Sequence, residues 1–336
     1  MNVSLLGMGW TTPLGRGLDE VCAAVEAGKI PALHHETGLP TGRTLPVFRV
    51  PPESLTDVTA LPRLRRSSAI SHFAVAAACD AASALTEEQR KRTALVFVST
   101  DGGVIYTRRF YSDIVERGPG SGSPLLFPET VYNAPASHIA ARLGLEGEAL
   151  TLVGDAEAGF DAIQTACELL ACGDCDYCLV AAAQELDWIT CEAYSNWKIG
   201  CFASGGATFS EGGAALLLGR EPGCIGVQLV PRQPASPSLT ELAASLPSPP
   251  DVVVSSNAGS PAGLREQTQL RKIFAKGLHF APKLSLGEAL ACSSIQQVIF
   301  AALTLQKSKK STSAAFATGF NHNVSALFLT RVPGHA

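Results

Sequence analysis

The segment Thr151–Leu170, TLVGDAEAGFDAIQTACELL, has the pattern of a buried strand that passes through a tight turn into a helix. Such a turn often presents a reactive side chain, because the free N–H groups and dipole at the start of a helix favour negative charge. Ala156 stands at this position and has no nucleophilic group. Asp155 and Glu157 beside it are typical first-turn acids, which could also act in acid/base chemistry.

Four of the ten cysteines could be read as metal ligands. They are Cys167, Cys172, Cys175 and Cys178 in CELLACGDCDYCLV, and the first three have the C-x4-C-x2-C spacing of an iron–sulfur loop. However, Cys167 lies in a helical pattern and Cys178 begins an apolar run, so the four are expected on three different elements. We therefore expect reduced, buried thiols and no metal site.

Short apolar runs alternate along the chain with longer segments of helical period, which predicts a layered α/β fold with a buried sheet. The runs are ALVFVST, ALTLVGD, YCLVAAAQE and GAALLLG, then DVVVSSN, AAFATGF and SALFLTRV. A Pro/Ser-rich stretch, residues 231–250, separates the two sets. We expect two similar halves, 1–220 and a shortened 221–336, although the stretch could be a surface loop of one half. A long helix is expected from Gly287 to about Gln306, with Glu288 in its first turn.

Composition excludes several classes of protein. The chain has 336 residues, of which 46% are hydrophobic and 17% charged, but it has no run near the roughly 18 apolar residues of a membrane span. A net charge of −4 gives no general affinity for nucleic acid or anionic membranes. The N-terminal segment lacks the pattern of a secretory signal, so a cytoplasmic location is expected. GMGWTTPLG lacks the spacing of a phosphate-binding loop, so no cofactor is expected.

Eight stretches, in order, resemble the β-ketoacyl-acyl carrier protein synthases of the thiolase superfamily. They are LLGMGWTTPLGRGLDEVCAAVEAGK, LPRLRRSSAISHFAVAAACDA, SPLLFPETVYNAPASHIAARLGLEGEALTLVGDAEAG, YCLVAAAQE, FSEGGAALLLG, NAGSPAGLREQTQLRKIF, PKLSLGEALACSSIQQVIFAAL and ATGFNHNVSALFL. The resemblance implies a duplicated α-β-α-β-α five-layer fold and a dimer with active sites near the subunit interface. It also implies decarboxylative condensation, in which a Cys carries the acyl chain and two His residues assist.

Carried over residue by residue, the resemblance implies that this condensing site is not intact. With Gly159 aligned to the glycine that closes the turn, Ala156 takes the Cys position. The first His falls on Asn257, or on Ser256 if the alignment has a one-residue gap. The second falls on Glu288, counted from Lys283, which matches the family's lysine. An ionised Glu cannot donate a hydrogen bond and would repel an enolate.

The loop GFNHNVS also departs from the family, because Asn321 and His322 follow Phe320 where small residues are expected. Lys283, Phe320 and Asn321 are expected in the pocket. A single Cys-to-Ala change could be engineered, whereas three departures together indicate an inherited loss of the condensing site.

Three functional hypotheses follow. The first is a non-condensing partner, similar to the chain-length factors that pair with active ketosynthases in polyketide, aryl polyene or fatty acid assembly. The second is an acyl-thioester hydrolase, cyclase or isomerase that uses replacement acid/base residues in the old pocket, namely Asp155, Glu157, Glu288 and His322. The third is a condensing enzyme that uses another cysteine, Cys201 or Cys292.

The expected partners are a second copy of the chain or an active ketosynthase. An acidic acyl carrier protein could bind either of two basic clusters. The first consists of Arg63, Arg65 and Arg66, and the second of Arg108 and Arg109. Alternatively, these arginines make internal ion pairs or only solvate the surface.

Overall fold

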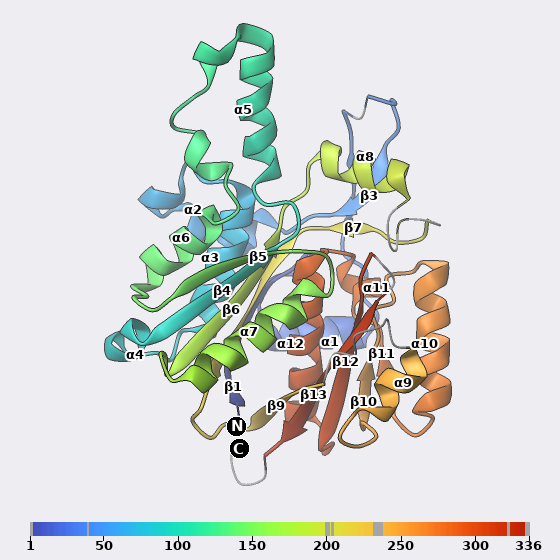
Figure 1. Cartoon of the computed structure of the whole chain (residues 1–336). Helices are drawn as coiled ribbons and strands as arrows, with labels where there is room; N and C mark the ends of the chain where they lie inside the picture. The colour runs from blue at the N-terminus through green and yellow to red at the C-terminus, as the bar shows by residue number, and fades with distance from the viewer. Residues whose placement is uncertain are drawn as a thin grey trace.

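The computed structural model describes residues 3–38, 40–198, 202, 205–230, 238–320 and 323–332 (Figure 1). Its strands are β1 Val3–Thr11, β2 Leu33–Glu36, β3 Leu45–Phe48, β4 Thr93–Ser99, β5 Ala149–Val153, β6 Tyr177–Gln184, β7 Phe209–Ser210, β8 Gly212–Gly219, β9 Ile225–Leu229, β10 Val252–Val254, β11 Leu278–Phe280, β12 Thr312–Thr318 and β13 Val324–Arg331. Its α-helices are α1 Leu18–Glu26, α2 Thr56–Thr59, α3 Ala69–Ala81, α4 Glu87–Lys91, α5 Val104–Arg117, α6 Ala134–Leu143, α7 Ala158–Cys172, α8 Trp188–Trp197, α9 Leu239–Ala244, α10 Pro261–Ile273, α11 Lys283–Leu286 and α12 Ala291–Lys307.

The main sheet shows an internal duplication. Its order is β11-β10-β12-β13-β9-β1-β8-β6-β4-β5, and a small second sheet has the order β2-β3-β7. Reading outward from β1, the pairings are antiparallel, antiparallel, parallel and parallel, and the same series runs outward from β9. Antiparallel pairing of Val3–Leu5 with Ile225–Val227 joins the two five-strand sets. The exact boundary between the halves, at residue 220, remains a prediction.

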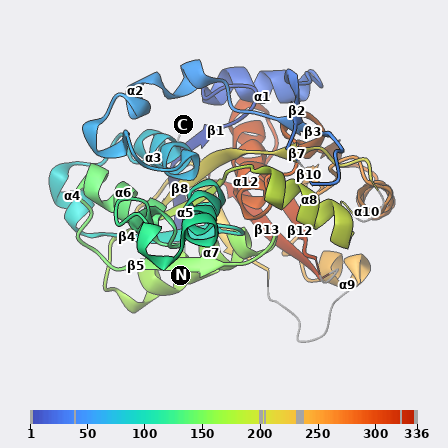
Figure 2. The ribbon, with the colours of Figure 1, turned by 90° about the horizontal axis from the view of Figure 1, so that it is seen from above.

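The strands separate three apolar cores because successive side chains point to opposite faces. In β4, Val96 and Val98 belong to the central core with α7 and α12, whereas Leu95 and Phe97 pack with α3 and α6. In the second set, alternate residues face the central core or α9 and α10. The layers are therefore helix, sheet, helix, sheet, helix, with α7 and α12 at the centre (Figures 1 and 2). This is the predicted thiolase-like α/β fold.

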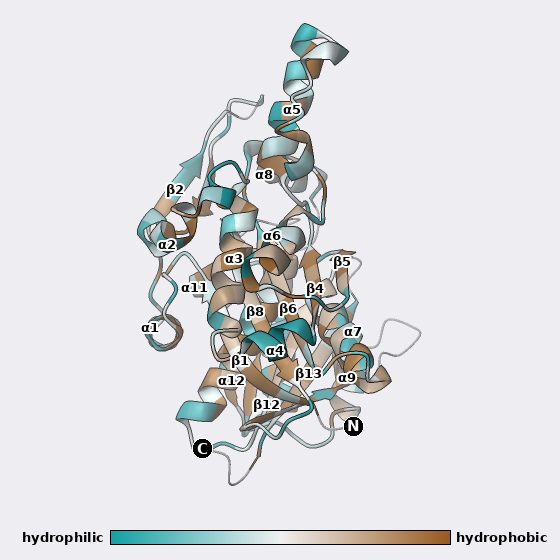
Figure 3. Ribbon diagram, turned by 90° about the vertical axis from the view of Figure 1, so that its left-hand side faces the viewer, coloured by the Kyte–Doolittle hydropathy of each residue, from teal (hydrophilic) through white to brown (hydrophobic). Residues whose placement is uncertain are grey.

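The central strands are strongly apolar along their length, as the hydropathy colouring of Figure 3 shows. The first set of predicted runs corresponds to β4, β5, β6 and β8, and the second to β10, β12 and β13. Within the described part of the chain, no helix has both the length and the apolar character needed to cross a membrane.

Two sequence predictions about individual elements are wrong. Helix α12 begins at Ala291, not at Gly287, because Leu290 has φ 52°, which is outside the helical range. Glu288 therefore precedes the helix. The Pro/Ser-rich stretch contains a helix, α9, which a capping box between Ser238 and Glu241 starts. Residues 231–237 of that stretch lie outside the described residues.

Helices α7 and α12 approach closely at Gly159. A Cβ added there would lie 2.1 Å from the Ser294 Oγ and 3.1 Å from the Ala291 carbonyl oxygen. No side chain fits without movement of α12, which is itself buried between the two sets of strands. This contact fixes the distance between the starts of the two central helices.

We predict that Gly159→Ala lowers the free energy of unfolding by about 1–3 kcal/mol through overpacking. Ser294→Ala in the same chain removes the nearest atom and should restore much of the loss, while Ser294→Ala alone should cost less than about 1 kcal/mol. Urea unfolding of the natural protein, the two single variants and the double variant measures the coupling energy between positions 159 and 294. Additive effects of the two substitutions would contradict the proposed contact.

Candidate functional site

The turn between β5 and α7 holds Ala156, which is buried and directly precedes the helix. Asp155 ties this turn to a distant part of the chain. Its Oδ1 accepts a hydrogen bond from the Glu157 N–H at 3.1 Å, and its Oδ2 accepts one from the Phe320 N–H at 2.5 Å. The carboxylate therefore holds the loop after β12 against the start of α7.

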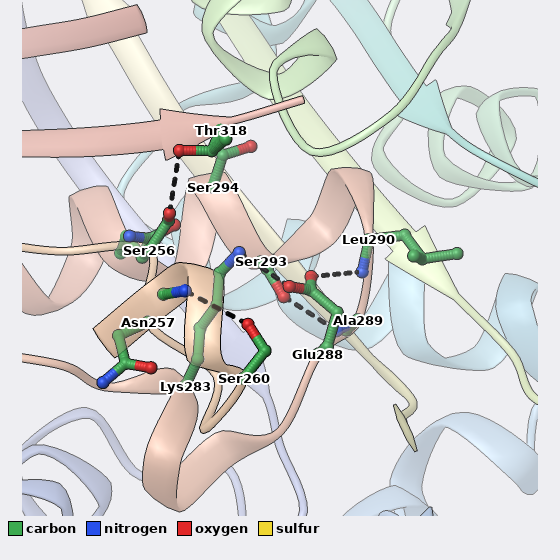
Figure 4. Close-up of polar contacts among 12 residues, drawn as sticks. Ser256, Asn257, Ser260, Lys283, Glu288, Ala289, Leu290, Ser293, Ser294 and Thr318 are labelled. Atoms are coloured by element: carbon green, nitrogen blue, oxygen red, sulfur yellow. Dashed lines mark hydrogen bonds and ion pairs between the residues drawn. The ribbon is translucent and has the colours of Figure 1, made fainter. Parts of the chain in front are cut away.

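Lys283 and Glu288 form a buried ion pair near the start of α12 (Figure 4). The Lys283 Nζ lies 2.9 Å from the Glu288 Oε2, and the Leu290 N–H donates to the Glu288 Oε1 at 3.0 Å. The latter bond supports Leu290 in its unfavourable left-handed backbone conformation. The chain turns at Gly287, with φ 79°, where a Cβ would approach the Ser210 Cβ to 2.6 Å.

Ser256 and Thr318 bind the carboxylate of Glu266, a residue of α10. The Ser256 N–H donates to the Glu266 Oε1 at 2.7 Å, and the Thr318 hydroxyl donates to the Glu266 Oε2 at 2.8 Å. The Ser256 hydroxyl also contacts this carboxylate and lies 3.2 Å from the Thr318 Oγ1, as Figure 4 shows. These contacts join the ends of β10 and β12 to α10.

Asn257 is buried, and its amide bonds to α10 and to its own loop. The Asn257 Nδ2 donates to the Gln267 Oε1 at 3.0 Å, and the Asn257 Oδ1 accepts from the Gly259 N–H at 2.9 Å. Asn257 does not line the pocket described next, whereas its neighbour Ser256 does.

A pocket of about 260 Å³ brings together Ala156, Lys283, Glu288 and Phe320 from the residues expected from the sequence. It is lined by Ala156, Leu239, Ser256, Ser260, Ala262, Gly263, Arg265, Glu266, Gln269, Lys283, Glu288, Thr318, Gly319, Phe320 and Val324. Asp155 and Glu157 line a separate hollow with Asp161, on the β5 side of the turn. Asn321 and His322 lie outside the described residues.

The chemistry of this pocket follows from its lining. None of the described lining residues is Cys or His. Lys283 can donate hydrogen bonds, but its ammonium faces the carboxylate of Glu288. The sequence reasoning did not single out five polar residues that also line the pocket, namely Ser260, Arg265, Glu266, Gln269 and Thr318.

The cysteines lie away from the pocket. Cys167 and Cys172 are on α7, Cys175 precedes β6 and Cys178 is on β6. No metal-binding group of three or more His, Cys, Asp or Glu side chains occurs among the residues described. Burial raises the pKa of the Cys167 thiol to about 11 and raises that of Cys178 further.

Of the two alternative nucleophiles proposed from the sequence, the structure describes Cys292, which does not line the pocket. The Cys292 thiol is completely buried and lies 3.7 Å from the Ala182 carbonyl oxygen in β6. Its burial raises its thiol pKa, so little thiolate forms at neutral pH. Cys201 lies outside the described residues.

Comparison with known proteins agrees with this fold. Residues 63–222 match the family described as beta-ketoacyl synthase, N-terminal domain. A curated 3-oxoacyl-[acyl-carrier-protein] synthase 2 from Vibrio harveyi is 24% identical over 188 residues, which cover 54% of this chain and 45% of the relative. The match thus spans less than half of that relative's length.

Solved structures match nearly the whole chain. The ishigamide ketosynthase/chain length factor has a TM-score of 0.82 at 19% identity and covers 99% of this chain and 100% of its own. The ketosynthase ApeO in complex with its chain length factor ApeC, from Xenorhabdus doucetiae, has a TM-score of 0.77 at 18% identity, covering 98% of each chain. Residues 63–222 thus match a beta-ketoacyl synthase N-terminal domain, and the chain as a whole has the fold of these ketosynthase structures.

We predict that Glu288→Gln lowers the free energy of unfolding by about 3 kcal/mol, because the Lys283 ammonium stays buried without its opposite charge. Lys283→Met added to Glu288→Gln should recover part of this loss. The matched control is Glu88→Gln in the exposed Lys91–Glu88 pair, which should cost less than about 1 kcal/mol. If the two Glu→Gln changes lower the free energy of unfolding equally in chemical denaturation, the buried pair contributes no more to stability than the exposed pair.

Proposed function

We propose that this chain is a ketosynthase-like subunit without condensing activity of its own, which acts as a chain-length-factor-type partner in polyketide, aryl polyene or fatty acid assembly. The observation that carries the proposal is the composition of the pocket. Ala156 provides no thiol, and none of the described residues that line the pocket is Cys or His. Among these residues there is therefore no thiol to carry an acyl chain and no imidazole pair to stabilise an enolate.

Two of the solved structures similar to this chain support this role. Both describe a ketosynthase with a chain length factor, and both match this chain over 98% or more of its length. Their likeness concerns the fold, so the pairing with a ketosynthase is our proposal for this chain.

The alternative, acid/base catalysis on an acyl thioester, has less support. The carboxylate of Asp155 accepts two backbone hydrogen bonds, and that of Glu288 is held by Lys283 and the Leu290 N–H. Both carboxylates are thus already engaged in contacts within the protein, which leaves them poorly placed to exchange a proton with a bound acyl thioester.

We predict that the isolated protein gains no acyl mass when incubated with acyl or malonyl thioesters, and releases no CO2 from malonyl carrier protein. Intact mass spectrometry and a CO2 assay measure the two outcomes, with an active ketosynthase as the positive control. Covalent loading traced to any cysteine would refute the absence of condensing chemistry.

A surface for the expected partner lies along β5 and the arm formed by residues 104–133. Helix α5 projects from the body and has no buried residue (Figures 1 and 3). The arm exposes large apolar side chains, namely Tyr111, Val115, Leu125, Phe127, Val131 and Tyr132. Strand β5 is an edge strand whose Val153 is 56% exposed, three residues before Ala156. An unpaired edge beside apolar side chains favours association with another chain of this fold.

The basic clusters differ in their surroundings. Arg108 pairs with Asp187, and Arg109 lies over the Tyr106 ring, 5.3 Å from its centre. Arg63, Arg65 and Arg66 are exposed and form no ion pair with any described residue. A hollow lined by Arg63, Arg142 and apolar side chains such as Leu61 lies beside them. We propose this cluster as the contact for an acidic acyl carrier protein.

We predict that Val153→Arg weakens the assembly formed by this chain, with itself or with a co-expressed ketosynthase, at least ten-fold in Kd. The matched control is Leu278→Arg, in the opposite edge strand β11, where the side chain is 45% exposed. Native mass spectrometry and sedimentation measure association. If both variants lose the same affinity, or if Val153→Arg loses none, β5 is not part of the interface.

A further inference from the structure

Carboxylates flank both ends of β5, the edge strand of the proposed partner surface. Glu146 and Glu148 come just before the strand and are exposed. Asp155 follows the strand and lines the hollow that also contains Val153. The unpaired backbone of an edge strand favours pairing with any other strand, so the charges beside it decide which partner is accepted.

The segment that contains β5 is strongly acidic. Residues 143–176 include eight Asp or Glu and no Lys, Arg or His, although the whole chain has a net charge of only −4. Glu146 and Glu148 form no ion pair within the described part of the chain. Lys91 lies near Glu146, but its ammonium pairs with the Glu88 carboxylate at 3.1 Å. The start of β5 therefore presents negative charge to solvent.

The described surfaces beside β5 add no net positive charge. None of the described residues that line the hollow after the strand is Lys, Arg or His. Asp155 accepts hydrogen bonds from two backbone N–H groups, which leave its charge in place. The arm, residues 104–133, contains three Arg and three Asp or Glu and is neutral in sum. The end of β5 is therefore negative as well.

Pairing of β5 with the same strand of a second copy would bring these charges together. Two identical chains associate about a two-fold axis, and an axis perpendicular to the sheet makes the two edge strands antiparallel. The start of each strand then lies beside the end of the other, so Glu146 and Glu148 of one copy approach Asp155 of the other. Neighbouring strands are about 5 Å apart, inside the range of about 10 Å over which charges interact at 0.1 M salt. Like charges in such positions destabilise the pair.

We propose that β5 selects against a second copy of this chain and accepts a different chain of the same fold, one that has Lys or Arg beside both ends of its own edge strand. The inference deepens the proposed function and rests on it, because it specifies the partner of the β5 surface. The unpaired backbone and the exposed apolar side chains supply the attraction, and the charges supply the specificity.

The double variant Glu146→Lys, Glu148→Lys tests the proposal, because its edge has a basic start and an acidic end and so becomes self-complementary. We expect this variant to self-associate at least ten-fold more tightly than the natural chain. Added salt should strengthen the natural pair and weaken the variant pair, since it screens repulsion in one and attraction in the other. Sedimentation at about 0.05 M and about 0.5 M salt measures both effects. Failure of the variant to associate more tightly would overturn the proposal.

Mixing the natural chain with the double variant tests the geometry of the contact. The mixed dimer has one like-charge contact and one opposite-charge contact, so its affinity should lie between those of the two like dimers. If the starts of the two strands faced each other instead, the mixed dimer would be the tightest of the three. Native mass spectrometry separates the three dimers when one chain is isotopically labelled. A mixed dimer tighter than both like dimers would overturn the proposal.

The matched control is Glu20→Lys with Glu53→Lys, which changes the net charge equally at exposed positions. Glu20 is on α1 and Glu53 lies just before α2, and both helices are on the opposite side of the molecule from β5 (Figure 2). This control should leave self-association unchanged, and tightening equal to that of the double variant would overturn the proposal.

Val153→Arg added to the double variant should abolish its gain in affinity, because the gain depends on contact along β5. A gain that survives this change would place the contact elsewhere and overturn the proposal. The absence of condensing activity fails only if the natural chain becomes acylated or releases CO2, whereas this inference fails on the charge dependence of association. The two failures are therefore distinguishable.

Discussion

The burial of α12 between two sets of strands is the constraint on which the rest of the structure depends. Residues Ala291–Leu305 of this helix are all buried, and its start meets that of α7 across Gly159. Both helices begin at the same pocket, because Ala156 precedes one and Glu288 precedes the other. The central core thus fixes the position of the pocket.

The residues that the resemblance aligns with the condensing positions and that line the pocket are each accommodated locally in this fold. Ala156 needs no partner, Ser256 bonds to Glu266, and Glu288 pairs with Lys283. A buried charge without a partner would cost several kcal/mol, so replacement by Glu at position 288 requires the adjacent lysine.

The sequence predicted the parts of the structure that local patterns determine. Apolar runs identified the central strands, and the strand-turn-helix pattern placed Ala156 at the start of α7. The pattern could not place Glu288, because the φ of Leu290 is set by packing in the core and not by helix propensity. Nor could it decide between Ser256 and Asn257, since a one-residue shift reverses which side chain faces the pocket. The contact of Asp155 with Phe320 joins residues 165 apart and has no local signal.

The same long-range contact gives the pocket its chemical character. In a site prepared for an acyl oxyanion, the backbone donors must be free until the charge develops. Here the carboxylates of Asp155 and Glu288 hold such donors in the resting protein. Hydrogen bonds that are complete before a substrate arrives cannot become stronger in a transition state, and only such strengthening accelerates a reaction. The N–H groups of Phe320 and Leu290 are therefore not available to a developing oxyanion while these two carboxylates hold them.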